Sequence, residues 1–194
     1  MKKIYMIAAV MLLAVAMPQV TKAQGLGVSN DKHQLSVSTN LLHWATITPD
    51  VGVEYRFDNR YAIVFHAAST FGTWELGDMR WGVNHFNPEL RYYMGSERQW
   101  YAGFGFNFGA VNWYNPKNNI GRQTDFYTYC LTGGYVLKLN KNLFLDFNLG
   151  IGYDQYKNWE HYYKIGDDYF RDSKTDHSGK PYVGQLAVNL TWKL

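Results

Sequence analysis

The feature that most constrains the fold of this chain is an alternation of large apolar residues with small or polar ones. It is clearest in LFLDFNLGIGY, residues 143–153, where every odd position from Leu143 to Tyr153 is large and apolar. The positions between them hold small or polar residues such as Asp146 and Gly150. A period of two predicts a β-strand whose two faces meet different surroundings.

Seven further segments show the same alternation. Together the eight segments are 34–42, 51–57, 61–71, 86–94, 100–110, 127–137, 143–153 and 182–194. Aromatic residues make up 18% of the 194-residue chain and Gly contributes 18 residues, a mixture that favours strands and tight turns over helices. We therefore predict an all-β fold in which eight antiparallel strands form an up-and-down meander.

Side-chain size indicates which face of these strands looks inward. The apolar faces carry large residues, whereas the opposite faces combine Gly with charged and amide residues. The interior of a closed eight-stranded barrel has room only for side chains, so Gly relieves crowding there and polar groups pair across the centre. We expect the apolar face to contact lipid, so that residues 34–194 form a transmembrane β-barrel. A soluble β-sandwich with the aromatic residues in a shared core is the main alternative.

The connections between the segments alternate in length. Short turns are predicted at 58–60, 95–98 and 140–142, and longer polar connections at 72–81, 114–125 and 157–181. Transmembrane barrels have brief periplasmic turns and extended extracellular loops. Aromatic residues near strand ends, such as Tyr61, Trp100 and Trp192, suit the two membrane interfaces.

The N-terminal residues have the pattern of a cleaved secretory signal peptide. Two lysines precede an apolar stretch, and small residues end at Ala23, after which we expect cleavage. A retained membrane anchor is the alternative. Residues 1–23 would be the signal peptide, and residues 24–33 a periplasmic segment before the barrel. We therefore expect the protein in the outer membrane of a Gram-negative bacterium.

Composition excludes two other classes of protein. Cys130 is the only cysteine, so there is no internal disulfide framework. The formal net charge of +3 is spread without a basic run, so we expect no nucleic-acid partner.

Charged residues on the small-residue faces predict a network inside the barrel. Glu54 and Arg56 lie two apart on one strand, and Glu89 and Arg91 lie two apart on another, so each pair shares a face. Buried charges must be paired, and a guanidinium matches a carboxylate at two points. We expect a lumen charge network that also includes His66 and Asp146. A structural plug is the preferred interpretation, with a proton path or a gate for small solutes as the alternative.

Catalysis and metal binding have weak support in the sequence. Small outer-membrane barrels include lipid-modifying enzymes, and Ser69 and His85 are the one candidate pair, without an evident third group to orient them. His161 and His177 lie among acidic residues in the last connection, but without the spacing of a metal site. We therefore expect a protein that is not an enzyme and has no metal or cofactor.

The last long connection is rich in aromatic residues and is the preferred contact surface. Long loops on rigid scaffolds often carry function, although a mobile solvated loop is the alternative. Candidate contacts to a surface protein or a glycan are Trp159, Tyr162, Tyr163, Tyr169 and Phe170. The other expected partners are outer-membrane lipid and the barrel-assembly machinery.

Three stretches carry a resemblance to a known family: TPDVGVEYRF (48–57), NPELRYYMG (87–95) and YAGFGFNFGAVNWY (101–114). They resemble uncharacterised small outer-membrane β-barrel proteins, a domain of unknown function of Bacteroides-type Gram-negative bacteria, some encoded near fimbrial genes. The resemblance implies the location and the fold, and it places Glu54, Glu89 and Arg91 in recurrent motifs. It supplies no activity or cofactor, and Pro88 within it predicts a bulge or a strand edge.

We therefore expect a non-enzymatic outer-membrane barrel with a structural or surface-interaction role, which the resemblance associates with fimbriae. The alternatives are a small-solute channel and a lipid-modifying outer-membrane enzyme.

Overall fold

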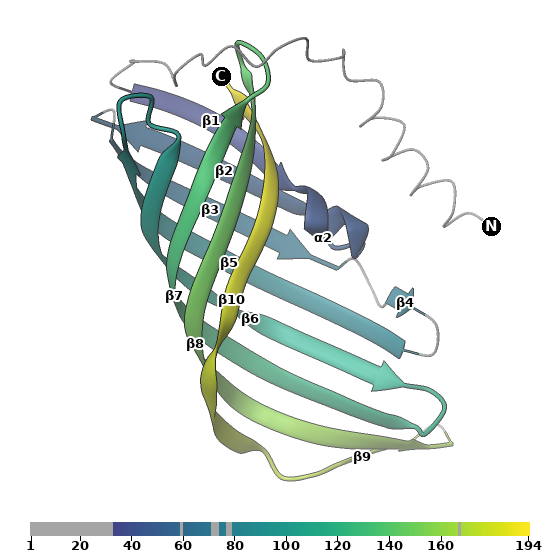
Figure 1. The fold of residues 1–194 in the computed structure, drawn as a ribbon. Helices are drawn as coiled ribbons and strands as arrows, with labels where there is room; N and C mark the ends of the chain where they lie inside the picture. Colours follow the sequence, from purple (N-terminus) through teal and green to yellow (C-terminus); the bar gives the residue numbers. More distant parts are fainter. Residues whose placement is uncertain (1–32, 59, 71–73, 77–78, 167) are drawn as a thin grey trace, which may run out of the picture.

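The structure, a computed structural model, describes residues 33–194 except 59, 71–73, 77–78 and 167 (Figure 1). The predicted signal peptide, residues 1–23, and all but the last residue of the predicted periplasmic segment lie outside the described residues. Within the described part, no helix is long and apolar enough to span a membrane.

The described chain consists of strands and one short helix. In order these are β1 (His33–Asn40), α2 (Leu41–Ala45), β2 (Asp50–Phe57), β3 (Tyr61–Ser69), β4 (Trp74–Leu76), β5 (Met79–Met94), β6 (Trp100–Asn115), β7 (Ile120–Lys138), β8 (Leu143–Ile165), β9 (Asp168–Arg171) and β10 (Thr175–Lys193).

Eight of the strands form a closed ring. Neighbours in the chain pair antiparallel in the order β1, β2, β3, β5, β6, β7, β8 and β10, and β10 pairs back with β1 in a register that sets Val37 opposite Trp192. The short strands β4 and β9 pair only with β5 and β8. The all-β meander of eight antiparallel strands is therefore confirmed, and a two-sheet sandwich is wrong because β1 and β10 close the sheet.

The ring wall has unequal height because the later strands are much longer than the first three. Strands β1 to β3 have 8 or 9 residues, whereas β8 has 23. The connections predicted at 114–125 and 157–181 are therefore wrong as long loops: β6, β7, β8 and β10 continue as paired strands through most of both ranges. In these ranges aromatic and polar residues mix without a period of two, so the hydrophobic alternation ends, but the backbone ladder continues.

The two faces of the ring strands differ in burial as the period of two predicts. In β2, buried positions alternate with exposed ones, so that Glu54 and Arg56 face inward and Val53 and Tyr55 face outward. The same pattern holds in β3 and over the first half of β8. The interior of the ring is therefore mainly polar, and its outer surface is apolar.

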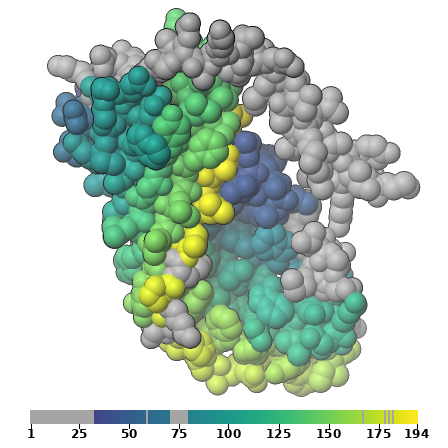
Figure 2. Space-filling model, viewed as in Figure 1, coloured from purple at the N-terminus to yellow at the C-terminus, as the bar shows by residue number. Residues whose placement is uncertain are grey.

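The first connection carries the helix α2, which the period of two did not predict. Leu41, assigned to the first strand segment, is in α2 instead, because Asn40 ends β1 and caps the helix by accepting a hydrogen bond from the Leu42 N–H at 3.1 Å. The space-filling view is hollowed below α2, beside β10 (Figure 2).

Pro88 lies inside β5 without the bulge or strand edge that was predicted. It is opposite Phe65 of β3, and β5 keeps one register with β6 on both sides of it, from Phe86 opposite Phe108 to Glu89 opposite Gly105. Proline removes one ladder donor toward β6, and the flanking pairs hold the strand in place.

Candidate functional site

Arg91 of β5 joins three carboxylates inside the ring. Its Nη1 donates to Asp146 Oδ2 at 2.8 Å, and its Nη2 donates to Glu89 Oε2 at 2.9 Å. The same Nη1 lies 3.4 Å from Glu54 Oε2. Since these carboxylates come from β2, β5 and β8, one fully buried guanidinium crosslinks separate walls of the ring.

Two aromatic rings support the cations of this network. The Cζ atom of Arg56 lies 3.7 Å from the centre of the Tyr93 ring, and its Nη2 donates to Glu54 at 3.1 Å. The Cζ atom of Arg91 lies 4.3 Å from the centre of the Tyr101 ring. Both positions are within cation–π range, and both tyrosine hydroxyls donate to carboxylates of the network.

Neutral donors complete the network, because its three carboxylates outnumber its two guanidinium groups. Glu89 accepts from Thr132 Oγ1 at 2.6 Å and from Asn148 Nδ2 at 3.1 Å. Asp146 accepts from Asn189 Nδ2 at 3.2 Å. Hydrogen bonds of this kind stabilise an ionised carboxylate away from water.

The space beside the network is small on the side of the short turns. A cavity of about 20 Å³ lies between it and the short-turn end of the ring, lined by residues that include Arg56, Tyr93 and Phe144. That volume holds about one water molecule. The geometry therefore crosslinks and fills this level of the ring.

His66 was predicted to join the Arg91 network, but it lies outside it. It lies on β3 opposite Gly52, nearer α2, and its Nδ1 is 3.0 Å from Asp50 Oδ1. A Cβ added at Gly52 would collide with the His66 ring and with Ser38. The missing side chain at Gly52 lets the imidazole turn toward Asp50, away from Glu54.

Asp50 is the centre of this second cluster. It is the first residue of β2, its side chain is fully buried, and its Oδ1 also accepts the backbone N–H of Asn40 at 2.8 Å. A buried carboxylate held by one backbone donor and one imidazole has a fixed orientation.

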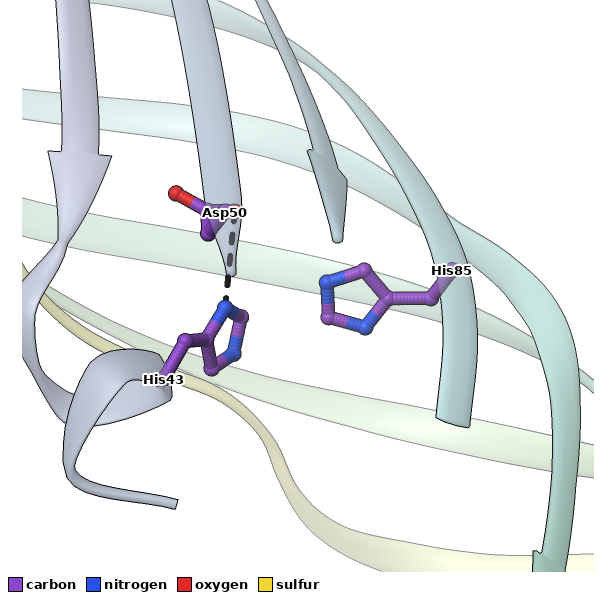
Figure 3. Close-up of side chains that lie close together, drawn as sticks. All are labelled: His43, Asp50 and His85. Carbon is purple, nitrogen blue, oxygen red and sulfur yellow. Dashed lines mark ion pairs between the residues drawn. The ribbon is translucent and has the colours of Figure 1, made fainter. Parts of the chain in front are cut away.

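His43 of α2 and His85 of β5 lie beside Asp50, and Figure 3 shows the three side chains close together. His43 Nδ1 is 3.4 Å from Asp50 Oδ2, but it is buried and makes no hydrogen bond. The two imidazole rings have centres 4.9 Å apart. One possible ligand atom from each of His43, Asp50 and His85 lies within 4.8 Å of the others. These residue types bind transition metals.

A cavity of about 180 Å³ adjoins the second cluster. His43, Asp50, His66 and His85 line it on one side, and β7 and β10 line the other. Two lining residues, Asn87 and Gln185, each have a buried side-chain carbonyl oxygen without a hydrogen-bond partner. The cavity therefore offers hydrogen-bond acceptors to a polar ligand.

The candidate pair Ser69 and His85 does not form. Ser69 faces outward on β3, where its hydroxyl donates to Asn84 Oδ1 at 2.6 Å, whereas His85 lines the interior. The two residues are close in register but lie on opposite faces of the wall.

A different serine makes contacts in the order Ser–His–Asp. Ser38 Oγ lies 3.4 Å from His66 Nε2, and His66 in turn contacts Asp50. Ser38 pairs with β2 on one side and β10 on the other, so its backbone N–H belongs to the ladder. The Ser38 N–H is therefore not free to serve as an oxyanion donor for acyl transfer.

The predicted contact residues of the last connection lie on strands. Trp159, Tyr162 and Tyr163 belong to β8, and Tyr169 and Phe170 belong to β9, so they are not loop residues. Tyr162 is buried, where its hydroxyl donates to Asn112 Oδ1 at 2.8 Å, and Trp159 is half-buried. The other three are exposed.

Sequence reasoning missed Asp50 and His43 as site residues. Asp50 shares its inward parity with Glu54, so extension of the alternating segment by one residue would have found it. His43 gave no such signal, because it lies on a helix of one turn whose direction is set by the caps at its ends. His85 shares the parity of Glu89, so its inward position could have been predicted, but it was considered only as a partner for Ser69, which lies on the opposite face.

Comparison with protein families identifies the family of this chain. Residues 8–194 match the family described as Protein of unknown function (DUF3575). No curated protein and no solved structure matches the chain.

Proposed function

The chain belongs to the family Protein of unknown function (DUF3575), and we propose that it is an eight-stranded β-barrel of the bacterial outer membrane. In this proposal it is not an enzyme, and it has a structural or surface-interaction role, associated with surface fibres. The observation that carries the proposal is that large apolar side chains are exposed on the outside of the ring, whereas polar and charged side chains are buried inside it.

Large apolar side chains cover the outside of the ring. Leu131 is 71% exposed, Ile151 66% and Leu186 59%, whereas Arg91 is 1% exposed. Contiguous apolar surface on this scale is rare on soluble monomers. Lipid is the solvent that such a surface matches, because in a transmembrane barrel the apolar band faces outward and the polar residues face the lumen.

Strand length and aromatic placement support the same proposal. A membrane-spanning strand needs about 9–11 residues, which the 8 or 9 residues of β1 to β3 approach. Tyr61, Trp100 and Trp192 are exposed, and all lie at the end of the ring that carries the short turns. Amphipathic rings favour the membrane interface, and the short turns would make this end the periplasmic one.

The tall part of the wall suits a contact role. The 23 residues of β8 are about twice what a bilayer crossing requires, so its second half would project outside the cell. Tyr163, Tyr169 and Phe170 are exposed there. Exposed aromatic residues on a rigid support provide contact area at low entropic cost. We propose that they contact a surface protein or a glycan.

The network across the lumen favours this role over a channel. Its side chains from β2, β5 and β8 meet inside the ring, with room for about one water molecule on the short-turn side and the cavity of about 180 Å³ on the other side. A lipid-modifying activity also lacks its expected residues, because Ser69 and His85 lie on opposite faces.

Localisation is tested by expressing the full chain in a Gram-negative host. We expect the protein in the outer-membrane fraction, with an N-terminus at Gln24 and a compact gel band that shifts on boiling. Recovery of the protein from the periplasm in soluble form, without detergent, would contradict the barrel proposal.

The role is tested with a deletion strain of the source organism, compared with its parent for surface fibres, lipid profile and envelope integrity. Complementation should use the parent chain and a variant in which Tyr169 and Phe170 are both serine. We expect the parent chain to restore surface fibres and the variant to fail, although both fold. Equal restoration would remove the contact role, and an altered lipid profile would favour an enzyme.

A further inference from the structure

We propose that His43, Asp50 and His85 bind one divalent transition-metal ion, for which zinc is the best fit. The three side chains come from α2, β2 and β5 and lie close together (Figure 3). Two imidazoles and one carboxylate form a donor set that zinc uses in proteins. Calcium and magnesium prefer oxygen ligands alone, so the histidines argue against them.

The distances suit a small ion. Zinc–ligand bonds of about 2.0–2.2 Å in a tetrahedron place neighbouring donor atoms about 3.3–3.5 Å apart. His43 Nδ1 and Asp50 Oδ2 are already 3.4 Å apart, and all three donor atoms fit within 4.8 Å. A shift of the His85 donor nitrogen by about 1 Å would complete the set. Among the described residues, no hydrogen bond holds the His85 ring.

A bound metal ion would give His43 Nδ1 the partner that it lacks. The nitrogen is buried, and its contact with Asp50 lacks the geometry of a hydrogen bond. A buried polar atom without a hydrogen-bond partner is unfavourable. A metal ion between this nitrogen and the carboxylate would remove that cost.

A second shell of contacts holds the carboxylate in place. Asp50 Oδ1 accepts from the Asn40 N–H at 2.8 Å. His66 Nδ1 lies 3.0 Å from Oδ1 and 3.3 Å from Oδ2, and Oδ2 also faces His43. Asn40 also caps α2, the helix that carries His43. One residue thus orients two of the three ligands, which is the support that metal sites require.

The cavity provides room for a fourth ligand. A zinc ion with three protein ligands keeps an open position for water or an anionic oxygen. Asn87 is 7% exposed, and its Oδ1 and the Gln185 Oε1 are unpartnered acceptors in the lining of this cavity of about 180 Å³. Amide oxygens of this kind accept hydrogen bonds from metal-bound water.

Binding is tested on the folded protein in detergent micelles, without a histidine tag and after removal of metal with a chelator. Titration with Zn²⁺ should show saturable binding of a single ion, and Co²⁺ should give visible absorption bands that Zn²⁺ removes. His43→Ala and His85→Ala should each weaken zinc binding by more than about 100-fold, the upper range for outer-shell changes. His66→Gln should weaken it by about 10–100-fold, as a positioning residue.

His33→Ala is the matched control, because His33 lies at the opposite end of β1 and contacts Tyr55. It should leave zinc affinity unchanged. NMR of histidine-labelled parent protein provides a readout without substitution, in which zinc should shift the His43 and His85 ring signals and leave those of His33 in place. Absence of saturable binding, or unchanged affinity in the His43 and His85 variants, would overturn the proposal.

Discussion

Arg91 shows, at the scale of single residues, how a charge can be buried in this ring. Its two Nη atoms contact Glu54, Glu89 and Asp146, and its plane lies against Tyr101. A buried ion pair adds little stability when compared with apolar packing, but removal of one partner leaves an uncompensated charge. The main effect of removing Arg91 would therefore be to leave buried carboxylates without a cation.

We predict that Arg91→Ala destabilises the folded ring by about 3–5 kcal/mol. The measurement is the free energy of unfolding in urea, together with the temperature at which the compact gel band is lost. Arg171→Ala is the control, because Arg171 pairs with Glu160 while its side chain is 57% exposed. An exposed pair contributes about 0–1 kcal/mol. Equal effects of the two substitutions would contradict the buried network.

At the scale of elements, strand β7 shows how glycine makes room inside the ring. A Cβ added at Gly134 would collide with the Tyr101 ring and the Phe147 carbonyl oxygen. At the neighbouring Gly133, the added Cβ would meet only the Tyr101 carbonyl oxygen, at 3.8 Å. One strand therefore carries one glycine that packing requires and one that it does not.

We predict that Gly134→Ala destabilises the protein by about 1–3 kcal/mol through overpacking. Tyr101 would have to move, and its hydrogen bond to Asp146 would be lost. Gly133→Ala should change the urea midpoint little. If the two alanine variants unfold at the same urea concentration, the inward packing of β7 against Tyr101 is wrong.

At the scale of the whole molecule, the question is which solvent the outer surface meets. Leu131 of β7 is 71% exposed, and it lies midway between Tyr127 and Tyr135 along the strand. Ile165, at the tip of β8, is 67% exposed. In water the two positions would be equivalent, whereas in a membrane only Leu131 would touch hydrocarbon.

We predict that Leu131→Lys destabilises the protein in lipid bilayers by about 2–4 kcal/mol, as for a lysine near the bilayer midplane. Ile165→Lys should be nearly neutral. The measurement is reversible unfolding in phospholipid vesicles. A neutral Leu131→Lys would contradict the orientation of the barrel in lipid.

The period of two was enough to predict the eight strands of the ring, their two faces and the short turns, because alternation is a local property of a strand. It also assigned Glu54, Glu89 and Arg91 to the inner face. Strand length was underestimated, because the ladder of β7 and β8 continues after the apolar pattern ends.

Only the tertiary structure decided which inward side chains meet. Parity along a strand gives the face of a residue, but contacts across the ring depend on the register of every pair and on the closure of β1 with β10. For that reason His66 contacts Asp50 and does not join the Arg91 network. For the same reason His43, Asp50 and His85 come together from parts of the chain that share no sequence pattern.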